Sequence, residues 1–275
     1  MTSEELSDDD LGSIISLVRT RYGYDFSNYA HASFRRRVIR VMETSALRPN
    51  DLLTKFLLEP QYVDEFLTGV TVNVTEMFRD PGLWLFLRNS LLPEIRRQAQ
   101  SFSVWHAGCS SGQEVLSMAI LLRELEMDHL VQITATDIDT VILSQARAAT
   151  YPAKQMEANV KNYQKAGGIG SLESYCTVEG RQVRFDQALL SRVAFRKHDL
   201  VSGGSFGKFD LIMCRNVLIY FNQKLQNQVV TDFHGSLNPG GFLAVGAKES
   251  LAWCDVANRF MVLDHDEKIF RKVRE

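Results

Sequence analysis

Several residues whose side chains or backbone could bind a ligand come directly after predicted strands. A glycine-rich turn at 108–112 (Gly-Cys-Ser-Ser-Gly) follows an apolar run and is followed in turn by Glu114. Asp137 follows the next apolar run, and Asp199 and the pair at 215–216 (Arg-Asn) follow two later ones. Because parallel sheets bind ligands beyond the carboxyl ends of their strands, we expect these residues to line a single site.

The glycine-rich turn indicates the charge of the ligand. Gly108 and Gly112 lack a Cβ, so a ligand can approach the backbone closely. A pyrophosphate favours a helix N-terminus free of acidic side chains, whereas Glu114 lies at the start of the helix predicted to follow. A carboxylate there suits a positively charged sulfonium, so the pattern favours S-adenosylmethionine (SAM) over a dinucleotide. The alternative for this turn alone is a strand–helix connection whose glycines serve packing.

Asp137 and Asp199 each have a ligand-binding and a structural interpretation. An acid at the end of the second strand can accept hydrogen bonds from both ribose hydroxyls, but a lone Asp there is also a common helix N-cap. Asp137 and Asp139 could divide these two roles. Asp199 could accept a hydrogen bond from an adenine amino group or cap a turn. The neighbouring glycine-rich turn favours ribose binding by Asp137.

The elements that must position these residues form an α/β pattern. Apolar runs predict strands at 102–107, 131–136, 193–197, 210–214 and 242–246, with helical patterns between them and a closing hairpin at 260–264 and 268–273. This alternation predicts a doubly wound, mainly parallel sheet of the Rossmann-like class. Residues 154–190 interrupt it. Their glycine-rich stretch and short alternating runs predict a small inserted antiparallel β-subdomain.

The part of the chain before this pattern is predicted to be helical. Ser7 and Asp10 form a capping-box pattern, and Gly23 is a typical helix stop. Further helices are expected at about 33–44, after Asn50 and at about 63–69, with no strand pattern between them. We therefore expect three regions: a helical domain at 1–72, a connector that contributes to the site at 73–90, and a SAM-binding domain at 91–275.

The composition excludes several classes of protein. Hydrophobic residues make up 45% of the 275 residues, enough for a sizeable core, and the formal net charge of −2 gives no overall attraction to nucleic acid. The sequence has no signal-peptide pattern and no apolar run of membrane-spanning length. Its four cysteines lack CxxC spacing, so we expect no disulfide framework and no metal site. These features predict a cytoplasmic protein that is not embedded in a membrane.

Four strings in order along the chain resemble those of the chemotaxis receptor methyltransferases, the CheR type. They are Asn-Val-Thr-Glu-Met-Phe-Arg at 73–79, Ser-Gly-Gln-Glu at 111–114 followed by Ser117, Ala-Thr-Asp-Ile-Asp at 135–139, and Cys-Arg-Asn-Val-Leu-Ile-Tyr-Phe at 214–221. The resemblance covers nearly the whole chain. It implies methyl transfer from SAM to glutamate side chains of bacterial chemoreceptors, with S-adenosyl-L-homocysteine as product.

The resemblance also implies roles for individual residues. Those implied to contact SAM, in addition to Gly108, are Asn73, Thr75, Arg79, Glu114, Asp137, Asp199, Leu200, Arg215 and Asn216. We expect Arg79 and Tyr220 to be catalytic, Arg79 by orienting charge at the reacting centre through charge-assisted hydrogen bonds. An ordinary core role is the alternative for Tyr220. The chain departs from the family pattern at Met77, where the family has Phe, at Asp199, where it has Asn, and at 246–250 (Gly-Ala-Lys-Glu-Ser).

A cluster of arginines predicts how a protein substrate would dock. Arg36 and Arg40 are one turn apart on the second predicted helix, and Arg37 adjoins them, so we expect an exposed basic ridge. Such a run is commonly only a solvated face, but receptor methylation helices are rich in glutamate and the resemblance implies docking by this helix. The implied partner is the cytoplasmic domain of chemoreceptors, with a receptor C-terminal peptide as a possible ligand of the β-subdomain, and we expect a monomer. The alternatives are a methyltransferase of another substrate and a non-catalytic SAM-sensing or receptor-docking module.

Overall fold

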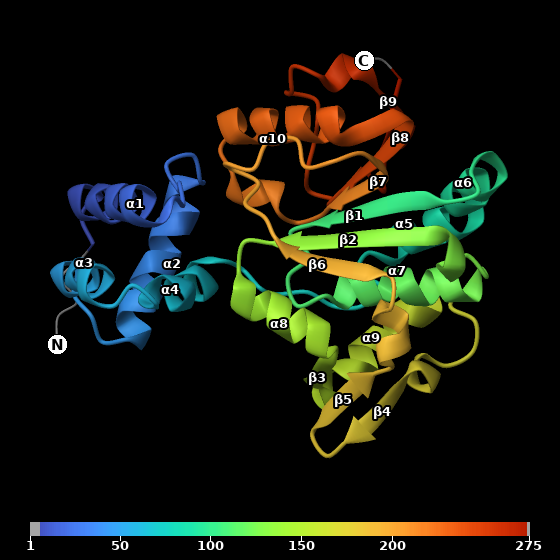
Figure 1. Ribbon diagram of the computed structural model, residues 1–275, viewed down its shortest axis with the longest axis horizontal. Helices are drawn as coiled ribbons and strands as arrows, with labels where there is room; N and C mark the ends of the chain where they lie inside the picture. The colour runs from blue at the N-terminus through green and yellow to red at the C-terminus, as the bar shows by residue number, and fades with distance from the viewer. Residues whose placement is uncertain (1–5, 274–275) are drawn as a thin grey trace.

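The computed structural model describes residues 6–273. The N-terminal part of this structure is a helical bundle (Figure 1). Its helices are α1 (Asp8–Tyr22), α2 (His31–Thr44), α3 (Pro49–Leu58) and α4 (Tyr62–Val70). The predicted capping box begins α1, because the Ser7 side chain accepts a hydrogen bond from the Asp10 amide and Asp10 accepts one from the Ser7 amide. α1 ends at Gly23, whose φ of 81° is left-handed. The helical prediction for this region is confirmed.

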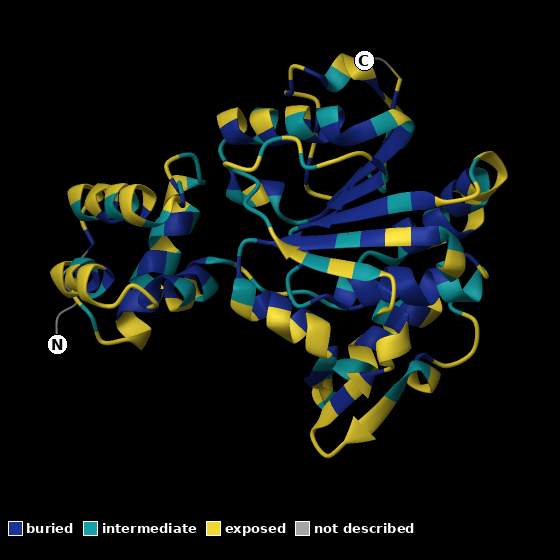
Figure 2. Cartoon of the chain, viewed as in Figure 1, coloured by how far each residue is buried: buried dark blue, intermediate teal, exposed yellow. Residues whose placement is uncertain are grey.

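The bundle has a hydrophobic core of its own. Its buried side chains, between Leu6 and Val70, form one cluster, and Phe34, Phe56 and Phe66 are among the fully buried ones. Figure 2 shows the buried faces of these helices turned toward one another and the exposed faces turned outward. We propose residues 1–72 as a separate domain, and this independent core supports that division.

The rest of the chain is built on a seven-stranded sheet in the order β6-β2-β1-β7-β8-β10-β9. The strands are β1 (Phe102–Ala107), β2 (Val131–Asp137), β6 (Val193–Lys197), β7 (Phe209–Cys214), β8 (Leu237–Val245), β9 (Phe260–Asp264) and β10 (Ile269–Lys272). The first five run parallel, and β9 and β10 form the predicted antiparallel hairpin at one edge. The Rossmann-like prediction is confirmed. The strand order reverses at β1, between β2 and β7, which is where such sheets bind ligands.

Helices cover both faces of this sheet. In Figure 1, α10 (Gln223–Ser236) lies on one side, and α7 (Gln113–Glu124) and α8 (Thr140–Ala148) lie on the other. Neighbouring residues of β1 divide between the two layers, since Val104 packs in the cluster that includes α7 and Trp105 in the cluster that includes α10. The bundle is joined to β1 by α5 (Pro81–Phe86), a π-helical turn (Leu87–Leu91) and α6 (Leu92–Gln98). No helix formed by the described residues is long and apolar enough to span a bilayer.

The insertion contains the predicted antiparallel sheet, in the order β3-β5-β4, but with β3 it begins at Thr150, before the predicted start at residue 154. Its strands are β3 (Thr150–Pro152), β4 (Cys176–Glu179) and β5 (Gln182–Phe185). It also contains a helix that the sequence interpretation missed, α9 (Met156–Lys165). Only Asn159 and Tyr163 are buried on α9, so its apolar periodicity is weak. The glycine-rich stretch at 167–170 follows this helix and forms no strand.

One predicted boundary in the sheet is wrong. We expected a strand that begins at residue 242, but β8 already begins at Leu237. Gly240 has a φ of 75°, and the pairing between β7 and β8 shifts register between Phe209 and Leu211. The Pro-Gly-Gly sequence at 239–241 is therefore an irregularity inside the strand.

Candidate active site

A cleft of about 300 Å³ opens at the carboxyl ends of β1, β2, β6 and β7. All ten residues predicted to bind the cofactor line it: Asn73, Thr75, Arg79, Gly108, Glu114, Asp137, Asp199, Leu200, Arg215 and Asn216. The predicted catalytic residue Tyr220 and the predicted docking residue Arg37 line it as well, whereas Arg36 and Arg40 do not. The fold therefore brings the predicted site together, and the role of each residue stays a prediction.

The two glycines of the 108–112 turn have different surroundings. Gly108 lines the cleft with a φ of 76°, and a Cβ there would lie 2.6 Å from the Val217 side chain. Gly112 does not line the cleft. A Cβ on Gly112, whose φ is 83°, would lie 2.8 Å from Cβ of Ala146 in α8. Close approach to a ligand is thus available at Gly108, while Gly112 permits the contact between α7 and α8.

Asp137 and Asp139 divide the ligand-facing and capping positions. Asp139 is the N-cap of α8 and accepts hydrogen bonds from the amides of Val141 and Ile142. Asp137 lines the cleft, and its carboxylate accepts from the amides of Ser110 at 2.8 Å and Asp139 at 3.1 Å. Burial raises the pKa of Asp137, and its backbone hydrogen bonds oppose that rise. These bonds fix the carboxylate at the end of β2, where ribose binding is predicted.

Asp199 caps the turn that follows β6, which is the structural alternative given for it above. One carboxylate oxygen accepts from the Val201 amide at 2.9 Å and the other from the Ser202 hydroxyl at 2.8 Å. The acid therefore holds the turn that follows β6. Because Asp199 and Leu200 also line the cleft, the predicted adenine contact remains a prediction.

Glu114, in the first turn of α7, lies at the centre of a buried ionic network. Its Oε1 lies 2.8 Å from His106 Nδ1, and its Oε2 accepts from Arg215 Nη1 at 3.1 Å. The other terminal nitrogen of Arg215 donates to Asp80. Burial alone would raise the pKa of Glu114, but the hydrogen bond to His106 and the charge of Arg215 outweigh it and hold that pKa below its ordinary value. Glu114 is thus ionised at neutral pH, and the Arg215 guanidinium is held in the wall of the cleft.

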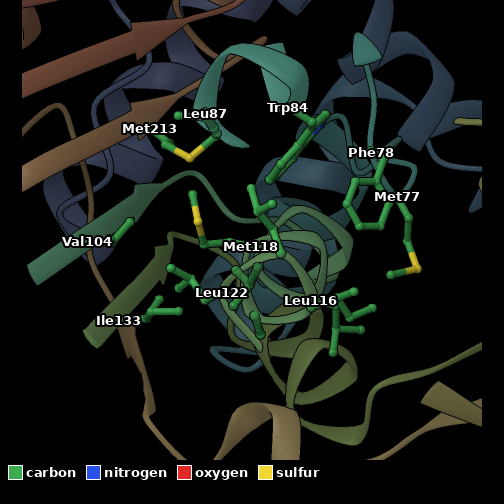
Figure 3. Packing of buried hydrophobic residues seen from close by; sticks show 14 of the residues in the cluster. Met77, Phe78, Trp84, Leu87, Val104, Leu116, Met118, Leu122, Ile133 and Met213 are labelled. Carbon is green, nitrogen blue, oxygen red and sulfur yellow. The ribbon is translucent and has the colours of Figure 1, made fainter. Parts of the chain in front are cut away.

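The connector fixes Arg79 at the cleft by burying the residues before it. Met77 and Phe78 are fully buried, and Figure 3 shows both directed into the core around α7. Their backbone amides donate to side-chain oxygens on α9 and α7. Phe78 and Asp80 have positive φ angles of 51° and 54°, which tertiary contacts must hold in place. Among residues 6–273, no side chain forms an ion pair with Arg79, so its charge is available to a ligand.

The position of Arg37 differs from the prediction that it lies on an exposed basic ridge with Arg36 and Arg40. Arg36 and Arg40 are exposed as expected, but Arg37 is directed into the cleft. Its Nη1 donates to the Val70 carbonyl at 2.7 Å, and its guanidinium carbon lies 4.8 Å from the ring centroid of Tyr220. Its Nη2 is buried with no hydrogen-bond partner in the described part of the chain. Consecutive helix residues point about 100° apart, so neighbouring arginines can face the solvent and the cleft.

Tyr220 ends a 3-10 turn (Leu218–Tyr220) that follows β7. Burial raises the pKa of its hydroxyl, and the charges of Arg37 and Arg79 oppose that rise. The hydroxyl is therefore neutral at pH 7 and can donate a hydrogen bond. The Tyr220 carbonyl accepts from the Ala30 amide at 2.8 Å, which joins this turn to the helical bundle.

Three residues that the sequence interpretation missed also contribute to the site. Glu249 is buried, and its carboxylate accepts hydrogen bonds from the amides of Gly246, Asn216 and Ile219. It ties the loop after β8 to the loop that carries Tyr220. His106 holds Glu114, as described, and Tyr29 lines the cleft from the loop before α2. The sequence could have pointed to Glu249 and His106 as site residues, because each is an ionisable residue beside an apolar run. Tyr29 carried none.

Residues 73–269 match the family described as CheR methyltransferase, SAM binding domain. The chain belongs to this family. A Pseudomonas putida protein named methyltransferase Cher3 is 38% identical over 273 residues, which cover 99% of this chain and 100% of that protein. The chemotaxis protein methyltransferase 1 of Pseudomonas aeruginosa is 36% identical over 193 residues, covering 66% of this chain and 68% of that protein. Among solved structures, the N-methyltransferase NodS of Bradyrhizobium japonicum with S-adenosyl-L-homocysteine has a TM-score of 0.40 and 13% identity, and the match covers 72% of this chain and 91% of that one.

SAM is the cofactor of this CheR methyltransferase, and the cleft has charges that suit it. The fixed carboxylate of Asp137 can accept hydrogen bonds from ribose hydroxyls. The ionised Glu114 favours the positive charge of SAM, and Arg79, which has no ion-pair partner among residues 6–273, is available to a carboxylate. A ligand without a carboxylate would leave the charge of Arg79 unmatched.

Proposed function

We propose that this CheR methyltransferase transfers the methyl group of SAM to glutamate side chains of bacterial chemoreceptors, as a protein-glutamate O-methyltransferase. The name chemotaxis protein methyltransferase, given to relatives from Pseudomonas aeruginosa and Listeria innocua, supports a substrate in chemotaxis. One observation supports a carboxylate as the methyl acceptor. Arg37 and Arg79 both line the SAM cleft, and neither pairs with a carboxylate among residues 6–273.

A carboxylate substrate fits these two arginines. Both lie close enough to Tyr220 for their charges to oppose the rise in its pKa. A glutamate side chain entering there can accept charge-assisted hydrogen bonds from Arg37 and Arg79 and a further bond from the neutral Tyr220 hydroxyl. An amine substrate would instead meet two positive charges. The charges of the cleft therefore favour an oxygen acceptor over a nitrogen acceptor.

The chemistry requires alignment more than proton transfer. A glutamate carboxylate is already ionised at neutral pH, so no general base is needed to create the nucleophile. SAM supplies a methyl group activated by its sulfonium. The protein must hold the acceptor oxygen in line with the methyl carbon and sulfur and exclude water. Arg79 and Tyr220 are the residues that we propose for this alignment.

The exposed face of α2 is the docking surface that we propose. Arg36 and Arg40 lie on it one turn apart, and Arg37 of the same helix reaches the cleft. A glutamate-rich receptor helix bound along α2 would thus have a carboxylate near the methyl donor. Among the strands of residues 6–273, the edge strand β4 pairs with β5 alone, which leaves an edge to which a receptor C-terminal peptide could add. We propose a monomer that acts in the cytoplasm on the cytoplasmic domain of the receptor.

A methyl-transfer assay tests the proposed acceptor. The protein is incubated with tritiated SAM and a receptor cytoplasmic fragment, or with a matched fragment whose methylation-site glutamates are replaced by alanine. We expect label on the first fragment only, released as volatile methanol by mild base because the product is an ester. Base-stable label, or equal label on both fragments, would point to another acceptor. Tight binding of S-adenosyl-L-homocysteine with no transfer to either fragment would favour a non-catalytic module.

A further inference from the structure

Tyr29 occupies the junction between the helical bundle and the methyltransferase sheet. It packs against the core of the bundle and also against the cluster that includes α10. Its ring centroid lies 5.7 Å from that of Phe34 in α2 and 5.1 Å from that of Phe221, which follows β7. The same side chain lines the SAM cleft. Tyr29 is therefore a residue of the bundle that reaches the cofactor site.

Backbone pairing fixes the position of Tyr29 in the chain against the loop after β7. Tyr29 and Phe221 form an isolated antiparallel bridge. On either side of it, the Ala30 amide donates to the Tyr220 carbonyl at 2.8 Å and the Asn222 amide donates to the Asn28 carbonyl at 2.8 Å. Segment 28–30 is thus held against segment 220–222. The pairing therefore holds the backbone of Tyr29 beside the cleft that this residue lines.

Tyr29 lines the same cleft as two acids predicted to bind the cofactor, Asp137 and Asp199. Burial raises its pKa, the charges of Asp199 and Asp137 raise it further, and Arg37 opposes them. The hydroxyl is therefore protonated at pH 7. No described residue forms a hydrogen bond with it, although it lies among the residues predicted to bind ribose and adenine.

We propose that the Tyr29 hydroxyl donates a hydrogen bond to the adenosine half of SAM, so that the helical bundle supplies part of the cofactor site. Asp137 is placed to accept from the ribose hydroxyls, and a neutral phenol complements it by donating to ribose oxygen or adenine nitrogen. The ring forms a wall beside Ile138 and Leu200, which also line the cleft. The inference depends on the cofactor alone and is independent of the methyl acceptor.

Calorimetry with two ligands tests this assignment. One ligand is S-adenosyl-L-homocysteine, and the other is 5′-methylthioadenosine, which has the adenosine half without the amino acid. Tyr29→Phe should weaken both ligands by the same factor, about 3- to 10-fold, the range of one lost hydrogen bond. Tyr29→Ala should weaken both further, because the wall is lost. The matched control is Tyr22→Phe, which removes a hydroxyl that donates to the Phe56 carbonyl inside the bundle.

The outcomes separate a cofactor contact from a structural role. Equal weakening of both ligands by Tyr29→Phe, with Tyr22→Phe unchanged, supports the assignment. Wild-type affinity in Tyr29→Phe overturns it. Weakening of S-adenosyl-L-homocysteine alone would move the contact to the amino-acid half and also overturns it. An equal loss in Tyr22→Phe would show that any damage to the bundle reaches the cleft, which again overturns it.

Discussion

The guanidinium of Arg37 lies over the ring of Tyr220, 4.8 Å from its centroid. Arg37 belongs to α2 in the helical bundle, and Tyr220 belongs to the loop after β7. The contact joins the proposed docking helix to the proposed catalytic loop at the mouth of the SAM cleft. It also distinguishes Arg37 from Arg36 and Arg40, which are exposed on the same helix.

Substitution of Arg37 should impair methyl transfer far more than substitution of Arg40. Arg37→Gln removes a charge at the cleft, and we expect kcat/KM for receptor methylation to fall about 10- to 100-fold, the range for a lost hydrogen bond to a charged group. Arg40→Gln should cause a loss of only a few-fold that disappears at high salt, since exposed charges are screened. Reversal of both Arg36 and Arg40 to Glu should weaken receptor methylation without changing S-adenosyl-L-homocysteine affinity. Losses of equal size and equal salt dependence for Arg37→Gln and Arg40→Gln would contradict this distinction.

Arg79→Ala and Tyr220→Phe should each reduce methyl transfer more than cofactor affinity. Both side chains are proposed to align the acceptor, so their removal acts mainly on the transition state. For Tyr220→Phe we expect a fall of about 5- to 10-fold in kcat. Tritiated-methyl transfer and calorimetry with S-adenosyl-L-homocysteine measure the two quantities. Equal losses in both would assign these residues to cofactor binding instead.

The ionic network around Glu114 should make stability depend on pH. The pKa of Glu114 is held below its ordinary value of 4.5, so the folded state binds its proton less readily than the unfolded state. The stabilisation is full above about pH 4.5 and is lost as the pH falls through the lowered pKa. The difference in free energy of unfolding between the wild-type protein and Glu114→Gln should therefore shrink between about pH 6 and pH 3. Urea denaturation across this range measures it, and a constant difference would exclude Glu114 as the source.

The two glycines of the 108–112 turn should respond differently to alanine. Gly112→Ala forces a Cβ to within 2.8 Å of Ala146 at a positive φ, and we expect a loss of about 1–3 kcal/mol in the free energy of unfolding. The folded Gly112→Ala protein should retain its affinity for S-adenosyl-L-homocysteine. Gly108→Ala should also destabilise the fold, since its Cβ would lie 2.6 Å from the Val217 side chain at a positive φ, but because Gly108 and Val217 both line the cleft it should in addition weaken that affinity. Denaturant titration and calorimetry on both variants provide the comparison, and the reverse pattern would show that Gly112 is the glycine beside the ligand.

Local sequence signals predicted the parallel strands and most strand-end residues. Strand ends are marked by a change from an apolar run to polar residues, and the fold class then places such residues at one edge of the sheet. Asp137 and Arg215 were found in this way, although the contacts of Arg215 with Glu114 and Asp80 were not foreseen. Those contacts depend on how the connector packs against the sheet, which no local pattern records.

The misplaced and missed features share a physical cause. α9 buries only Asn159 and Tyr163, so its stability comes from tertiary contacts and its sequence pattern is weak. The direction of Arg37 and the position of Tyr29 are set by contact between the bundle and the sheet. Hydrophobic periodicity identifies the buried face of a helix, but it does not say which exposed side chain a second domain will cover.

The pairing of segment 28–30 with segment 220–222 has a consequence for how this family can diversify. A chimera whose first 72 residues came from a relative would have a different residue packed against Phe221 and a different side of the cleft. The proposed receptor docking surface and part of the proposed cofactor site would therefore change together. The β-subdomain differs, because no residue between Ile138 and His198 lines the cleft. The insertion is constrained indirectly instead, because Asn159 of α9 accepts a hydrogen bond from the Met77 amide and so helps to hold the connector that carries Arg79.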